Sequence, residues 1–166
     1  VVIVDNNKNN IEEAKKMGLE AFTANVFSDD LMNNIELNDI GYLMALTGNT
    51  AVNKKAIENF QKQFGEKGTF RVISSDEMKN PENNPKEGLF SHTDDYIKLV
   101  NLTRRYPNIH ETDLNSNDHY NGLIEISKTD PELIPIFVKR AESDELDIIP
   151  SDSQQITVEK DDKLIY

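Results

Sequence analysis

Several residue types and patterns that define common protein classes are scarce or absent. There is no cysteine among the 166 residues, so disulfide bonds and thiolate chemistry are excluded. No apolar run approaches the roughly 20 residues that cross a bilayer, and we expect no direct membrane insertion of this segment. Lysine and arginine number 18 against 30 acidic residues, which gives a formal net charge of −12. This acidity disfavours general electrostatic binding to nucleic acid or anionic lipid.

The usual patterns of catalytic and metal-binding residues are also missing. His92, His110 and His119 are scattered, and none has metal-ligand spacing with another histidine. No serine has a histidine–acid pairing visible in the sequence, and no pair of groups is typical of a general acid and base. We therefore predict no metal site and no catalytic residues, and a protein that is not an enzyme.

The most informative stretch is the opening run Val1-Val2-Ile3-Val4-Asp5. Unbroken β-branched residues predict a strand buried on both faces, as in parallel sheets covered by helices. Asp5 at its carboxyl end could cap the next helix, or its two oxygens could accept from the vicinal hydroxyls of a ribose. In a dinucleotide-binding fold this would be the second strand. Because no glycine-rich turn precedes it, we expect a piece of a larger fold.

Strands and helices are predicted to alternate over the first 75 residues. We expect strands at 1–5, 19–24, 42–46 and 70–73, helices at 9–17 and 51–64, and a short helix after Ser28. This alternation predicts right-handed βαβ units and a mostly parallel sheet. Asn25 and Thr47 follow two of these strands, at the sheet edge where ligands bind. An amide can contact adenine and a hydroxyl can contact ribose or phosphate, although both residue types are also common in turns.

The second half has a different pattern. Residues 76–88, with Pro81 and Pro85, predict a linker between a domain at 1–75 and a module at 89–166. A helix starting at Thr93 is expected to bury Tyr96 and Leu99. Short strand-like runs follow at 109–114, 123–127, 134–139, 146–149, 156–159 and 164–166. The predicted fold class is α/β: a truncated Rossmann-like parallel sheet with helices, followed by a small, mainly antiparallel α+β module.

Two runs carry a resemblance to a known family. Val1 to Asp5, and Ala45-Leu46-Thr47 followed by Asn49, Val52 and Asn53, resemble the later part of a TrkA-N (RCK-like) domain. Such domains are nucleotide-binding regulatory domains of potassium channels and cation antiporters. The resemblance implies that Asp5 binds ribose, that Asn25 lies near adenine and that Thr47 lies beside the cleft. It also implies NAD(H) or an adenine nucleotide as ligand of the full-length protein, with none bound by this fragment. The absent strand would leave a gap between the present first and third strands.

The second half resembles a narrower group. Gly88-Leu89-Phe90, the run 133–138 and the run 162–166 resemble the cytosolic tail of bacterial NhaP-type sodium/proton antiporters, and the closing strands resemble a TrkA-C module. This implies a regulatory domain on the cytoplasmic side of the bacterial inner membrane, with the transmembrane transporter domain of the same chain as partner. A fragment of an NAD-dependent oxidoreductase, or an assembly domain with a vestigial cleft, stays open as an alternative. The unpaired edge of the first strand predicts a homodimer.

Overall fold

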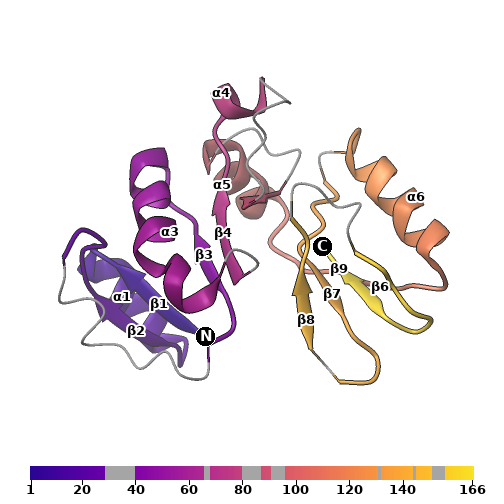
Figure 1. Cartoon of the computed structure of the whole chain (residues 1–166), viewed down its shortest axis with the longest axis horizontal. Coiled ribbons are helices and arrows are strands. Elements are labelled where there is room, and N and C mark those ends of the chain that lie inside the picture. The colour runs from indigo at the N-terminus through magenta and orange to yellow at the C-terminus, as the bar shows by residue number, and fades with distance from the viewer. Residues whose placement is uncertain are drawn as a thin grey trace.

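A computed structural model describes residues 1–28, 40–65, 68–79, 87–90, 96–130, 132–143, 145–150 and 156–166. The predicted helix after Ser28 lies outside these residues. Figure 1 shows parallel strands with helices in the first half and a small antiparallel sheet in the second. This arrangement confirms the predicted fold class.

In the residues that the structure describes, the first half contains two separate parallel sheets. The elements in order are β1 (Val2–Asp5), α1 (Lys8–Lys16), β2 (Glu20–Thr23), β3 (Leu43–Ala45), α3 (Thr50–Phe64), β4 (Thr69–Val72), α4 (Ser75–Met78) and β5 (Gly88–Leu89). One sheet has the order β1-β2 and the other β3-β4-β5. No hydrogen-bonded ladder joins β1 to β3 in the described residues, which agrees with the predicted gap between these strands. The predicted strands and helices are observed with ends shifted by at most one residue.

Helix α1 begins and ends where its sequence indicates. The Asn7 side chain caps its start by accepting from the Asn9 backbone N–H, and Lys15 and Lys16 occupy its last turn. Ile11 and Ala14 are buried against β1 and β2. Met17, three residues after Ala14, is 77% exposed because it is the C-cap and lies beyond the last helical residue.

Strand β1 is less buried than its apolar sequence predicts. Ile3 packs against α1, and Val2 belongs to the cluster around Phe60 of α3. Val4 is outside both clusters and is 43% exposed. The expectation of a strand buried on both faces is therefore wrong at Val4, because the α3 side chains cover only the start of the strand.

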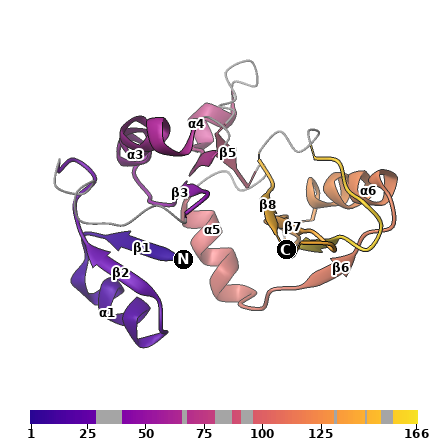
Figure 2. The same ribbon diagram turned by 60° about the horizontal axis from the view of Figure 1, so that its bottom comes forward.

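The second half contains α5 (Tyr96–Arg105), β6 (Glu111–Asp113), α6 (Asn117–Ser127), β7 (Phe137–Lys139), β8 (Leu146–Ile148) and β9 (Lys163–Ile165). The strands form an antiparallel sheet of order β6-β9-β7-β8. Helix α5 has no fully buried residue; Leu99 is half-buried and Tyr96, which we expected to be buried, is 39% exposed. Figure 2 shows α5 between the parallel-sheet half and the antiparallel sheet.

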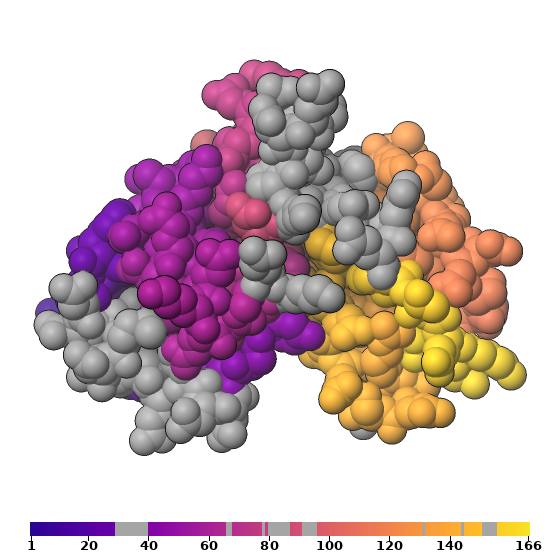
Figure 3. Space-filling model, in the orientation of Figure 1, coloured from indigo at the N-terminus to yellow at the C-terminus, as the bar shows by residue number. Residues whose placement is uncertain are grey.

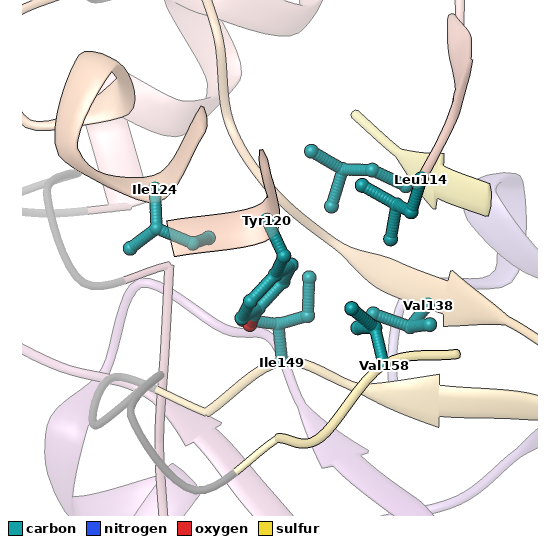
Figure 4. Packing of buried hydrophobic residues seen from close by; sticks show 7 residues of the cluster. Leu114, Tyr120, Ile124, Val138, Ile149 and Val158 are labelled. Carbon is teal, nitrogen blue, oxygen red and sulfur yellow. The ribbon is translucent and has the colours of Figure 1, made fainter. Parts of the chain in front are cut away.

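Two of the strands predicted in this half are wrong. Residues 123–127 belong to helix α6, because Ser116 caps it and the four-residue spacing of Tyr120 and Ile124 places both side chains on its buried face. Residues 156–159 form no strand, since the Val158 N–H donates to the Asn117 side chain at 2.8 Å rather than to a neighbouring strand. Figure 4 shows Tyr120 pointing from α6 towards Ile149 and Val158 in the core of this half.

A second core joins the two halves. It combines Phe70 and Val72 of β4, Leu89 and Phe90, and Ile148 of β8. Leu89 also forms an isolated antiparallel bridge with Pro150, and Figure 3 shows the surfaces of the two halves in contact. The predicted linker, 76–88, includes most of α4 and the first residue of β5. The boundaries of the predicted domains stay a prediction.

Candidate ligand site

Asp5, the predicted ribose acid, is the last residue of β1 and organises the turn into α1. One carboxylate oxygen accepts from the Asn7 backbone N–H at 2.8 Å, and the other accepts from Asn10 Nδ2 at 2.7 Å. The carboxylate is half-buried. A carboxylate has about four acceptor positions, so these two bonds leave room for two hydroxyl donors. The cap of α1 is Asn7 and not Asp5, which instead holds the turn before the helix. The free acceptor positions of Asp5 are compatible with ribose binding, which stays a prediction.

Asn25, the predicted adenine contact, lies in the turn that follows β2. Its side-chain oxygen accepts from the Phe27 N–H at 3.0 Å, and its backbone oxygen accepts from the Ser28 N–H at 2.9 Å. This is the local bonding of an Asx turn. The side-chain NH₂ group is not used by the turn, so it is the part of Asn25 that could contact a base.

Thr47, the third predicted residue, is held by a buried asparagine that our prediction of site residues left out. The Thr47 N–H and hydroxyl donate to Asn53 Oδ1 at 3.1 and 2.7 Å, and Asn53 Nδ2 donates to the Thr47 carbonyl oxygen at 2.9 Å. Asn53 is 2% exposed. Asn49 caps α3 by accepting from the N–H groups of residues 51 and 52. The Ala45 to Asn53 run is thus a strand-to-helix turn with a fixed geometry.

The three predicted residues are only partly brought together. Asp5 and Asn25 are neighbours, because the Ala24 N–H donates to the Asp5 carbonyl oxygen at 3.1 Å as β1 and β2 end. Thr47 follows β3, which belongs to the other sheet. The contact between the two groups is made by α3, where Asn59 Nδ2 donates to the Val26 carbonyl oxygen at 2.7 Å.

A buried ion-pair network in the same half was missed by sequence reasoning. The Arg71 side chain is 2% exposed and donates to both carboxylate oxygens of Glu77 at 3.0 and 2.9 Å, and to Glu87 at 3.1 Å. Lys54 of α3 also contacts Glu77, at 2.9 Å. The only sequence signal was the Ser74–Glu77 capping box, which the structure contains. The network attaches α4 to β4 and α3.

The charges in this network shift the pKa values of its members. The hydrogen bonds from Arg71 hold the pKa of Glu77 well below its ordinary value, against the opposing effect of burial. Burial alone would lower the pKa of Arg71, but its hydrogen bonds to Glu77 and Glu87 outweigh burial and raise it. Both groups are therefore charged at neutral pH, and the network is structural in character rather than poised for proton transfer.

Clusters of metal-ligating side chains and membrane-spanning helices are both absent from the described part of the chain. No group of three or more histidine, cysteine, aspartate or glutamate side chains there could hold a metal ion. No helix among those residues is long and apolar enough to cross a membrane.

Comparison with protein families identifies the first half of the chain. Residues 1–83 match the TrkA-N domain, and the chain belongs to this family. TrkA-N domains are nucleotide-binding regulatory domains that typically bind NAD(H). Comparison with curated proteins found no match.

Proposed function

We propose that the chain is a nucleotide-sensing regulatory region on the cytosolic side of a monovalent cation:proton antiporter, and that it modulates transport rather than catalysing a reaction. The observation that carries the proposal is the TrkA-N match over residues 1–83. It is supported by polar side chains after three of the parallel strands, at Asp5, Asn25 and Thr47. The antiporter assignment itself rests on the resemblance of the second half to NhaP-type tails.

The partner in this proposal is a transmembrane transporter domain of the same longer chain. A nucleotide that binds one arrangement of the regulatory region more tightly than another shifts the population of transporter states. The shift is limited by the difference in affinity between the two arrangements. The core shared by β4, β5 and β8 supports this mechanism, because packed side chains connect the two halves there.

The direct test of ligand binding is calorimetric titration with NAD, NADH, ATP and AMP. It is carried out on this chain and on a version extended upstream of Val1. We expect the extended version to bind at least one nucleotide. Asp5→Asn should weaken that binding by about tenfold, the effect of losing a charge-assisted hydrogen bond. Asp113→Asn, on exposed strand β6, is the matched control. Absence of binding to any of the four nucleotides would refute nucleotide sensing.

The regulatory role is tested separately in the full-length transporter. Cation-dependent proton flux is measured in vesicles with and without the nucleotide that binds. We expect nucleotide to change the flux of the parent protein but not that of the Asp5→Asn variant. A flux that does not respond to a nucleotide that is shown to bind would contradict the regulatory role.

A further inference from the structure

The loop that carries Thr47 contacts helix α5 through an aromatic ring. The Tyr96 ring lies against Gly48, where an added Cβ atom would be 3.0 Å from Cδ1 and 3.5 Å from Cγ and Cε1 of that ring. A Cβ contact of 3.0 Å is tighter than nine in ten real Cβ contacts, so a side chain at position 48 would require the ring to shift by a few tenths of an ångström. Gly48 lies directly between Thr47 and Asn49.

The loop beneath the ring is held in one shape. Thr47 is fixed by Asn53, and the Asn49 N–H donates to Thr47 Oγ1 at 3.2 Å, across Gly48. The ring therefore rests on a rigid part of the backbone. A ligand that engages Thr47 competes for the same hydroxyl and changes the hydrogen bonds that shape this part of the backbone.

Helix α5 makes two further contacts, one with the core shared by the two halves and one with the loop before β7. Leu99, three residues after Tyr96, packs against the core that joins β4 and β5 to Ile148 of β8. Tyr106, just beyond the end of the helix, donates from its hydroxyl to Glu132 at 2.5 Å. Figure 2 shows the helix between the two halves. Helix α5 therefore connects the Tyr96 ring to contacts of the antiparallel module.

We propose that Tyr96 is a positioning residue for the Thr47–Asn49 loop and that, through α5, it links ligand binding in the TrkA-N half to the antiparallel module. The ligand part of this proposal rests on the proposed nucleotide binding. Coupling between two sites is reciprocal. A conformational change in the antiparallel module would therefore also change the affinity of the Thr47–Asn49 loop for its ligand.

The first experiment needs no ligand. Gly48→Ala forces the ring away from the loop. We expect the amides of α5 and of β7 and β8 to exchange about threefold faster or more, as local opening becomes easier. Adding Tyr96→Ala removes the clash, so Gly48→Ala should have little further effect in that background. Gly41→Ala, where the added Cβ has nothing within 4 Å, is the control. Unchanged exchange in α5, β7 and β8 of Gly48→Ala would overturn the link.

The second experiment uses NADH as the probe and hydrogen exchange as the readout, and its parent chain is the version extended upstream of Val1, which we expect to bind nucleotide. In the parent chain we expect NADH to change exchange in β7 and β8. Tyr96→Ala should still bind NADH but lose this remote change, whereas Tyr96→Phe should keep it because the contact involves ring carbons. A remote change that persists in Tyr96→Ala would refute the role of the ring. If no nucleotide binds the parent chain, the ligand part fails together with the proposed function, and the Gly48→Ala experiment decides the link by itself.

Discussion

At the scale of single residues, Asn53 has the strongest influence on the geometry of the predicted site. Its side chain is 2% exposed and satisfies both the N–H and the carbonyl oxygen of Thr47. A buried polar group is stable only when it is paired, so the Asn53 amide and the Thr47 backbone depend on each other. Thr47, the predicted ligand contact, and Asn53, which fixes its position, are six residues apart in the sequence.

The role of Asn53 can be tested by truncation. Asn53→Ala leaves the Thr47 backbone without these partners and should lower the free energy of unfolding by about 2 kcal/mol. Urea denaturation measures this change. Asn101→Ala, on the exposed side of α5, should cost much less. Equal destabilisation by the two variants would contradict the structural role of Asn53.

The lowered pKa of Glu77 leads us to expect that the free energy of unfolding depends on pH. Its folded pKa is lower than its ordinary value of 4.5, first because Arg71 donates hydrogen bonds to the carboxylate. A carboxylate with a lowered folded pKa contributes its full stability above its unfolded pKa. That contribution is lost as the pH falls below about 4.5 towards the folded pKa.

Glu77→Gln should therefore cost about 2 kcal/mol at pH 7, because it leaves Arg71 buried with one carboxylate fewer. The variant should also lose stability less steeply than the parent chain between pH 5 and about pH 3. Thermal denaturation followed over this pH range is the measurement. Glu58→Gln is the control, since the Glu58 side chain is 68% exposed in its pair with Lys55. Parallel pH profiles for Glu77→Gln and the parent chain would show that Arg71 does not hold this carboxylate ionised.

At the scale of elements, helix α6 shows how a capping residue outweighs a short apolar run. Leu123 to Ser127 alone has the composition of a strand. Ser116, with Tyr120 and Ile124 at helical spacing, makes the same residues part of a helix that covers the antiparallel sheet. The run 123–127 contains neither the cap nor Tyr120, the first buried residue of the helix.

The cap of α6 can be tested with two substitutions at one position. Ser116→Ala removes the acceptor for the His119 N–H and should destabilise the chain by about 1 kcal/mol. Ser116→Asp keeps an acceptor and adds a favourable charge at the helix start, so it should be close to neutral. Circular dichroism during urea denaturation distinguishes them. A Ser116→Asp variant as unstable as Ser116→Ala would argue against capping.

At the scale of the whole molecule, the two halves share a hydrophobic core that no local sequence pattern predicts. Ile148 is 6% exposed and packs with Phe70, Val72 and Leu89 from the first half. Tyr42, at the start of β3, is also affected by the second half: burial raises its pKa first, and the nearby Asp147 and Glu145 carboxylates raise it further. The antiparallel module therefore packs directly against the parallel sheet.

Truncation of this shared core should affect both halves. Ile148→Ala is expected to cost about 3 kcal/mol and to lower hydrogen-exchange protection in β4 as well as in β7. Ile126→Ala, at a residue that is 51% exposed, is the control. Loss of protection confined to the antiparallel sheet would show that the halves unfold independently.

The open edge of β1 predicts self-association. Among the described residues β1 pairs with β2 alone, so its other edge presents unpaired backbone groups. We expect pairing of these edges in a homodimer, and light scattering over a range of concentrations measures it. Pro in place of Val4 should weaken the dimer, because proline has no N–H to donate. A chain that stays monomeric at high concentration would contradict edge pairing.

The sequence by itself determined the strands and helices from β1 to β4 and the family to which the chain belongs, but it predicted a linker where α4 and β5 lie. These follow from local causes: β-branched runs, capping asparagines at positions 7 and 49, and glycines at 18 and 65 with positive φ angles. Only the tertiary structure showed the contacts of Asn53, Arg71 and Tyr96. Each acts through a partner distant in sequence or through its degree of burial, and a local pattern contains neither kind of information.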